Sequence, residues 1–171
     1  WTRQIPNSNP ITAIKTVGNK LFVGMNEAGI NKLYVIDRNN GSPIKSRPFN
    51  GTMLAPAIAG NTIYVAGQQL SAQDVDNIDS TLWQLNPNNG VTTPPVFVYP
   101  GQKAIAELFF ADGGGQIHVL NAHTGEDKMQ LNGVAGAKFI NVTTDYIVAT
   151  GDGFVRIFAR NDGHQTYNLP I

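Results

Sequence analysis

Three carboxylates lie close together in one segment of the sequence. Asp74, Asp76 and Asp79 fall within six residues, inside the segment Gln68–Ser80. Carboxylate oxygens are ligands that Ca²⁺ prefers, so a calcium site is one interpretation of this spacing. The spacing differs from that of an EF-hand loop, because Ile78 stands where the third ligand would be and the glycine of such a loop is missing. A solvated acidic loop without metal is the alternative, and we prefer it.

Two glycine-rich segments are the next candidates for chemistry. Asp112–Gly115 and Gly151–Gly153 could cradle a phosphate with their backbone amides. Apolar strands flank both segments, however, and neither is followed by the Lys-Ser/Thr pair of a phosphate-binding loop. We therefore interpret both as hairpin turns.

The remaining residue types offer no catalytic constellation. The histidines are His118, His123 and His164, and they lack the spacing of a histidine-rich metal site. The Gly-x-Ser-x-Gly motif of a nucleophile elbow is missing. The sequence has no cysteine, which excludes disulfides, cysteine-ligated zinc, iron–sulfur clusters and a cysteine nucleophile. We predict no catalytic residue.

The balance of charge argues against two classes of partner. Lys and Arg together number 12, as do Asp and Glu, and charged residues make up 14% of the sequence. A neutral chain offers no electrostatic attraction to nucleic acid or to an anionic membrane surface. No apolar run reaches the length of about 18 residues that a membrane-spanning helix needs. We expect neither nucleic-acid binding nor membrane insertion.

A repeated unit accounts for the glycine-rich turns. A polar turn that ends in glycine follows an apolar strand four times, with the glycines at positions 41, 90, 125 and 163. The intervals are 49, 35 and 38 residues, near the roughly 40–50 residues of a four-stranded propeller blade. Gly18-Asn19 and Gly60-Asn61 precede a bulky strand in the first two units, and such pairs supply the positive φ of a two-residue hairpin.

Each unit is predicted to be a sheet of four antiparallel strands, A to D, and the fold an all-β propeller with almost no helix. Four blades are expected, at about 11–49, 53–99, 103–131 and 137–171. Residues 1–10 are expected to be the last strand of a preceding blade and a linker, and the start at Trp1 rather than Met suggests that something precedes it. Because one blade cannot bury both its faces, neighbouring blades must cover them.

The strand and turn before each glycine resemble the quinoprotein-like propeller repeats, known as PQQ-type repeats. The signature of these repeats is a strand similar to Leu-Tyr-Ala-Leu-Asp, two or three turn residues, Thr-Gly, and a Trp four residues after the glycine. The matches are, from the best to the weakest, Leu33–Asp37 with Gly41, Ile117–Asn121 with Thr124-Gly125, Leu82–Asn86 with Gly90, and Val155–Phe158 with Gly163. The resemblance implies the fold and says little about activity.

The chain departs from the family pattern in two ways. The docking Trp of the repeat would fall at Lys45, Pro94, Met129 and Tyr167, so no complete blade is expected to keep it, and Trp1 would serve the blade before. Complete rings of this family have seven or eight blades, so four blades resemble half a ring. The open faces of the first and last blades should then be covered by further blades or by a second copy of the chain.

A quinone-dependent dehydrogenase of this family would need residues that the sequence lacks. The resemblance implies a disulfide between adjacent cysteines, a stacking Trp, calcium ligands and an Asp base around a central pocket. The chain has no cysteine, and Glu107 is the lone acidic residue on the expected inner strands. We therefore expect no quinone cofactor.

A non-enzymatic propeller module that acts as a scaffold for protein–protein interaction is the preferred interpretation. Its character within the family is nearest to the outer-membrane assembly lipoproteins, which implies a periplasmic, cell-surface or secreted location. Two alternatives stay open. One is half of a quinoprotein-like oxidoreductase whose cofactor residues lie elsewhere, and the other is a carbohydrate-binding or adhesive surface propeller.

The predicted recognition surface is a loop of the second blade. The segment Gln68–Ser80 is interpreted as an insertion between strands B and C, on the face of the propeller where loop lengths vary most. Apolar side chains on an exposed loop need a reason, and a protein partner is one. The candidates for partner contact are Gln69, Leu70, Val75 and Ile78. The alternative is that the apolar residues pin the loop against its own blade.

Overall fold

The computed structural model describes residue 2 and residues 11–27, 29–99 and 105–171 of the chain. This part consists of strands, turns and loops; it has no helix, and thus none long and apolar enough to cross a membrane. The strands are β1 (Ile11–Val17), β2 (Lys20–Glu27), β3 (Ile30–Asp37), β4 (Pro43–Pro48), β5 (Ala57–Ala59), β6 (Thr62–Ala66), β7 (Leu70–Asp74), β8 (Thr81–Leu85), β9 (Val96–Val98), β10 (Glu107–Ala111), β11 (Gln116–Asn121), β12 (Asp127–Asn132), β13 (Ala137–Val142), β14 (Tyr146–Gly151), β15 (Phe154–Ala159) and β16 (Gln165–Pro170).

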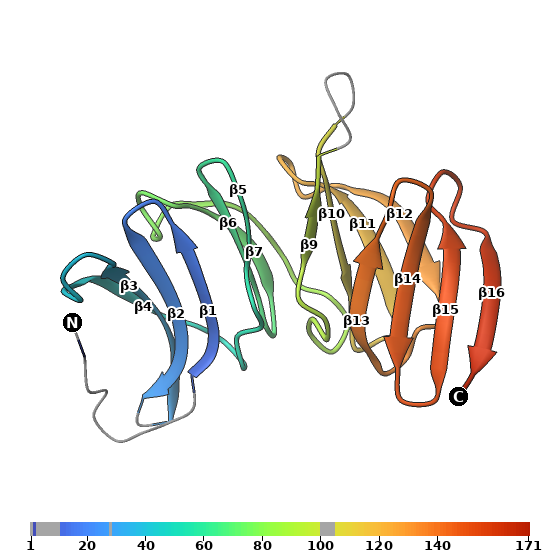
Figure 1. Cartoon of the computed structure of the whole chain (residues 1–171), viewed down its shortest axis with the longest axis horizontal. Coiled ribbons are helices and arrows are strands. Elements are labelled where there is room, and N and C mark those ends of the chain that lie inside the picture. Colours follow the sequence, from blue (N-terminus) through green and yellow to red (C-terminus); the bar gives the residue numbers. More distant parts are fainter. Residues whose placement is uncertain (1, 3–10, 28, 100–104) are drawn as a thin grey trace.

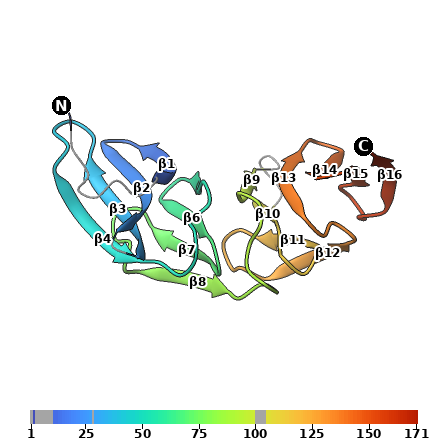
Figure 2. The same ribbon diagram turned by 90° about the horizontal axis from the view of Figure 1, so that it is seen from below.

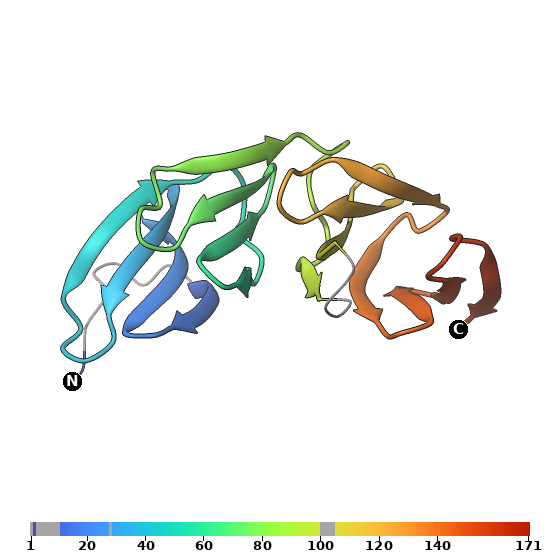
Figure 3. The same cartoon turned by 90° about the horizontal axis from the view of Figure 1, so that it is seen from above.

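The strands form four sheets of four, and each sheet is an antiparallel meander of consecutive strands (Figure 1). We call β1–β4, β5–β8, β9–β12 and β13–β16 blades 1 to 4. Figures 2 and 3 show the blades along an arc, with β1, β5 and β9 toward its concave side and β4, β8 and β12 toward its convex side. The prediction of an all-β fold with four propeller-type blades is confirmed.

The Gly-Asn pairs form the tight turns that the sequence predicts. Gly18-Asn19 joins β1 to β2, and Gly60-Asn61 joins β5 to β6. Gly18 and Gly60 have φ of +54° and +55°, in the left-handed region that glycine enters without steric cost. The glycine-rich segment Asp112–Gly115 is likewise a turn, between β10 and β11.

The boundary between blades 2 and 3 differs from the expectation. Blade 2 spans 57–85, because β8 pairs with β7 as its fourth strand. Blade 3 spans 96–132, because β9 pairs with β10 as its first strand. The expected ranges 53–99 and 103–131 assign β9 to the wrong blade.

The strands of blades 1 and 4 lie within 11–49 and 137–171. The strand expected in residues 1–10 lies outside the described residues, apart from residue 2.

The error at blade 2 has a physical cause. Strand β7 reads Leu-Ser-Ala-Gln-Asp, which lacks the bulky β-branched and aromatic residues that signal a strand. Its first four side chains are nevertheless buried, since both faces of β7 are covered. The segment 86–90, which resembles a C–D turn, instead belongs to the linker between β8 and β9.

Three apolar clusters join the four blades. Phe22, Leu33 and Val35 of blade 1 pack against Ile63 and Val65 of blade 2. A second cluster lies between blades 2 and 3 and includes Tyr64, Ala72, Leu108, Phe110 and Leu120. A third lies between blades 3 and 4 and includes Phe109, Val119, Leu131, Ile147 and Phe158. The core of this chain therefore lies between its sheets, as face-to-face packing of blades requires.

Trp83 holds the docking position of blade 2. It is the third residue of β8, as Lys45 is of β4 and Met129 of β12. Its indole Nε1 donates a hydrogen bond to the Ala122 carbonyl of blade 3 at 3.0 Å, and its ring lies against Gly125. The expectation that no complete blade keeps the docking Trp is wrong, because it placed Trp83 on strand C.

Candidate functional site

The three carboxylates of the predicted calcium site have other partners. Asp74 Oδ1 accepts hydrogen bonds from the backbone amides of Asp76 and Asn77, at 2.6 and 3.1 Å. Asp76 pairs with Lys20 of blade 1 at 2.5 Å, and Asp79 pairs with Lys45 of the same blade. Among the described residues, no group of three or more His, Cys, Asp and Glu side chains is arranged to hold a metal ion. The structure thus does not gather these residues into a calcium site.

The segment that contains the three carboxylates links blade 2 to blade 1 by hydrogen bonds and ion pairs. Lys20 Nζ also donates to the Val75 carbonyl at 3.1 Å, and Arg47 Nη1 donates to the Ile78 carbonyl at 2.9 Å. The hydrogen bond from Lys20 and its positive charge hold the pKa of Asp76 below its ordinary value. Basic side chains of blade 1 therefore hydrogen-bond to the turn between β7 and β8.

The apolar candidates for partner contact are buried. The exposed fractions of Leu70, Val75 and Ile78 are 0%, 5% and 2%. Leu70 belongs to the cluster between blades 2 and 3, whereas Val75 and Ile78 belong to the one between blades 1 and 2. Gln69 is half-buried, and its Nε2 donates to Asn86 Oδ1 at 2.8 Å. The predicted recognition loop is wrong for the three apolar residues. They pack at the interfaces of blade 2 with blades 1 and 3, and not against their own blade alone as the alternative proposed.

The predicted position of this loop also needs correction. The segment Gln68–Ser80 contains strand β7 and the turn from β7 to β8. In every blade the turn between strands B and C is short, as between Ala66 and Leu70. The predicted insertion between strands B and C of blade 2 is therefore absent.

His118 is held between two carboxylates inside blade 3. Its Nε2 lies 3.2 Å from Asp112 Oδ2, and its Nδ1 lies 3.1 Å from Asp127 Oδ1. The ring stacks on Phe110, with centroids 4.7 Å apart and planes 3° from parallel. Since the Asp112 side chain is fully buried, this contact belongs to the blade interior and is closed to substrate.

A second charged cluster joins blades 3 and 4. Glu107 Oε2 accepts a hydrogen bond from Arg160 Nη2 at 2.8 Å, and Oε1 of the same carboxylate pairs with Lys128. Arg160 also donates to the Thr143 carbonyl at 3.0 Å and lies over the Phe109 ring. Burial raises the pKa of Glu107, but the hydrogen bonds from Lys128 and Arg160 outweigh it and hold the pKa below its ordinary value.

Substitution of Glu107 by Gln should weaken the chain in a pH-dependent way. A carboxyl with a lowered pKa stabilises the fold above its unfolded pKa and loses that contribution as pH falls through the folded pKa. We expect Glu107→Gln to cost about 1 kcal/mol at pH 7, and the difference from the parent to shrink below about pH 4.5. Urea denaturation from pH 7 to pH 3 measures this difference, with the exposed Glu126→Gln as control. A difference that stays constant over this range would contradict the prediction.

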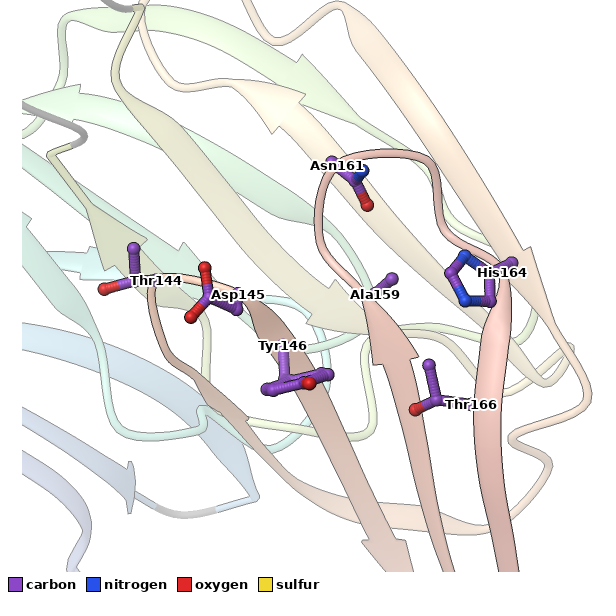
Figure 4. Close-up of a pocket in the computed structure, with 7 residues that line it drawn as sticks. All are labelled: Thr144, Asp145, Tyr146, Ala159, Asn161, His164 and Thr166. Carbon is purple, nitrogen blue, oxygen red and sulfur yellow. The ribbon is translucent and has the colours of Figure 1, made fainter.

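Two open hollows adjoin Arg160 and the turn between β13 and β14. One, of about 620 Å³, lies between blades 3 and 4 and is lined by Tyr99, Thr143 and Arg160 among others. The other, of about 360 Å³, lies on blade 4. Figure 4 shows the second hollow, with Tyr146 on one side and His164 on the other. Thr144 lines both, so they form one continuous surface, which we call the blade 3–4 surface.

The chemistry of the blade 3–4 surface suits binding better than catalysis. Its side chains are of mixed character on an open face, with hydroxyl, aromatic, basic, acidic, amide and aliphatic groups, and Arg160 already pairs with Glu107. His164 Nδ1 pairs with Asp162 of its own turn at 2.6 Å, with both side chains exposed. A nucleophile with an oriented base and a water-excluding wall is not found among these residues.

Comparison with solved structures gives the fold a close geometric match. The crystal structure of BamB from Moraxella catarrhalis superposes with a TM-score of 0.72 and 20% sequence identity, over 95% of this chain and 51% of that one. The computationally designed Ika4 protein superposes with a TM-score of 0.69 and 15% identity, over 90% of this chain and 92% of that one. No protein-family model matches the sequence, and no curated protein does.

The extent of the BamB match bears on function. This chain spans about half the length of the BamB structure. At 20% identity the likeness shows the fold, a β-propeller, and carries no residue-level correspondence.

Sequence reasoning did not find the blade 3–4 surface. The expected blade 2 ended at position 99, which placed Tyr99 at the end of that blade, whereas it follows β9 within blade 3. Arg160 lies 53 residues from its partner Glu107. A contact at that separation leaves no local pattern in the sequence. The one available signal for this surface would have been an alignment of the repeats that assigned β9 to blade 3.

Proposed function

We propose that this chain is a non-enzymatic β-propeller module that acts as a scaffold for protein–protein interaction in the cell envelope or outside the cell. The observation that carries the proposal is the superposition of 95% of the chain on BamB. The resemblance of its turns to PQQ-type repeats, and to the outer-membrane assembly lipoproteins in character, supports the same interpretation.

The use of its charged residues supports a scaffold. Lys20, Lys45 and Arg160 form ion pairs across blade interfaces, so these three basic side chains hold blades together. The face left for a partner has shallow relief and mixed polarity, as non-obligate protein interfaces do. We assign the blade 3–4 surface to the partner, because it combines an exposed tyrosine, Tyr99, with hydroxyl groups and an arginine.

Site-specific photo-crosslinking tests the proposal. A benzophenone amino acid is placed at Tyr99 or Thr144, and the matched control is Ile30, an exposed residue of blade 1. In the source organism we expect positions 99 and 144 to capture the same envelope protein and position 30 not to. Capture at all three positions alike, or at none, would contradict a partner at this surface. Reduction of a dye that depends on added PQQ and calcium would favour the oxidoreductase alternative, and selective binding on a glycan array the carbohydrate-binding one.

A further inference from the structure

Four Asn-Gly pairs in the sequence could undergo a covalent change without an enzyme. The backbone nitrogen of the glycine can attack Cγ of the asparagine, because glycine has no Cβ to hinder the approach. The reaction needs a glycine amide without a hydrogen-bond partner and an asparagine side chain that is free to turn toward it. The pairs are Asn40-Gly41, Asn50-Gly51, Asn89-Gly90 and Asn132-Gly133.

The turn between β3 and β4 restrains the first pair. The Gly41 amide donates a hydrogen bond to the Asp37 carbonyl at 2.8 Å. Asn40 Oδ1 accepts one from the Ser42 amide, also at 2.8 Å. Attack at this pair requires both bonds to break, so it must wait for a local opening of the turn.

The pair in the linker from β8 to β9 and the pair at the end of β12 are restrained as well. The Gly90 amide donates to the Pro87 carbonyl at 3.2 Å, and the backbone of Asn89 is in the left-handed region, with φ of +57°. Asn132 Oδ1 accepts a hydrogen bond from Gln116 Nε2 at 2.8 Å. At each of these pairs a hydrogen bond must break before the side chain can reach the glycine amide.

The pair Asn50-Gly51 is free of these restraints. Both residues are exposed, in the linker from β4 to β5. Within the part of the chain that the structure describes, neither the Asn50 side-chain amide nor the Gly51 backbone amide has a hydrogen-bond partner. The Asn50 carbonyl accepts a long hydrogen bond, from the Gln68 amide at 3.2 Å. Both requirements of the reaction are therefore met at this pair.

We propose that Asn50 is a site of spontaneous deamidation, and that its isoaspartate product weakens the contact of this linker with blade 2. The Gly51 nitrogen forms a bond to Cγ of Asn50 while the Cγ–Nδ2 bond breaks, and Nδ2 leaves as ammonia with the proton of the Gly51 amide. Water then opens the succinimide ring. Opening at the main-chain carbonyl gives isoaspartate, and opening at Cγ gives aspartate.

Isoaspartate adds a methylene to the main chain where the linker has little freedom. The Phe49 amide is hydrogen-bonded to blade 1 at 2.7 Å, and the Leu54 amide to blade 2 at 2.8 Å. A Cβ on Gly51 would lie 2.9 Å from Gln68 N, so the linker is in close contact with blade 2 between these two points. A longer main chain should therefore displace the Asn50 carbonyl from the Gln68 amide.

The rates of deamidation in the folded and unfolded chain test the proposal. Both samples are stored at a mildly alkaline pH, one of them in concentrated urea, and peptide mass spectrometry follows each asparagine. In urea the four pairs should react at similar rates. In the folded chain Asn50 should keep about its unfolded rate, whereas Asn40, Asn89 and Asn132 should react at least about tenfold more slowly. An Asn50 protected as strongly as Asn89, or an Asn89 as reactive as Asn50, would overturn the proposal.

Two variants separate the added charge from the longer main chain. Asn50→Asp has the charge of the product without the methylene, and Asn50→Gln cyclises more slowly because its ring is one atom larger. Hydrogen exchange at the Gln68 amide should be faster in the stored parent, and unchanged in fresh Asn50→Asp and in stored Asn50→Gln. Electron-transfer fragmentation identifies isoaspartate at position 50. Unchanged exchange in a parent rich in isoaspartate, or equally fast exchange in fresh Asn50→Asp, would overturn the effect assigned to the longer main chain.

Discussion

Replacing His118 by Leu is expected to destabilise the chain by about 3–5 kcal/mol, because it strands a buried carboxylate. Asp112 is fully buried, and its Oδ2 faces the imidazole while its Oδ1 accepts from the Gln116 amide at 2.9 Å. Leucine fills much of the imidazole volume and preserves contact with Phe110, so the main loss is the partner of the Asp112 charge. Urea denaturation followed by circular dichroism measures the effect.

A second substitution separates the charge from the packing. Asp112→Asn in the His118→Leu background removes the stranded charge but keeps an oxygen for the Gln116 amide. The double variant should therefore be more stable than His118→Leu alone. Asp127→Asn is the matched control, because the Asp127 side chain is 31% exposed and water can replace its partner. A double variant less stable than His118→Leu would show that the cost arises from packing and would contradict this explanation.

The turns and inner strands were predictable because their signals are local. Gly18-Asn19 and Gly60-Asn61 specify hairpins by positive φ alone, without reference to the rest of the chain. Leu33–Asp37 with Gly41 likewise contains a strand and its turn in one short segment. Repetition of such units was sufficient to predict four sheets.

The errors arose where burial reverses the usual composition of a strand. Strand β7 lies in a blade with a neighbouring sheet on each side, and Ser71 and Ala72 are buried there although neither is bulky. The sequence therefore resembles a loop, and the apolar residues around it appeared to be a recognition surface. Val75 and Ile78 are in fact core residues of a blade interface.

The candidate site was hidden for a different reason. The blade 3–4 surface is assembled from the end of β9, from strands β13 to β16 and from the turns before β14 and after β15. Its charged link, from Glu107 to Arg160, joins residues on different sheets. Such pairs depend on how blades stack, which follows from the fold and not from the spacing of residues in one repeat.

Alanine at Gly125 should cost far more than alanine at Gly60, although both glycines have positive φ. A Cβ on Gly60, where φ is +55°, would meet no atom within 4 Å. The free energy of unfolding should therefore fall only by the backbone strain, about 1–2 kcal/mol. A Cβ on Gly125, where φ is +76°, would lie 2.7 Å from Trp83 Cδ2. Displacing a packed indole adds about 1–3 kcal/mol.

The difference between the two variants measures how strongly blade 2 docks on blade 3. We expect Gly125→Ala to cost about 2–5 kcal/mol in all, from the sum of strain and overpacking. In a Trp83→Ala background the Cβ has room, so the added cost of Gly125→Ala should fall to that of Gly60→Ala. Hydrogen exchange is measured on the parent, Gly125→Ala, Trp83→Ala and the double variant. The loss of protection should lie at the boundary of β8 and β11, because neighbouring blades are stabilised chiefly by their shared interface. Equal costs for Gly125→Ala and Gly60→Ala in the parent would mean that Trp83 does not dock on the turn, and would contradict the prediction.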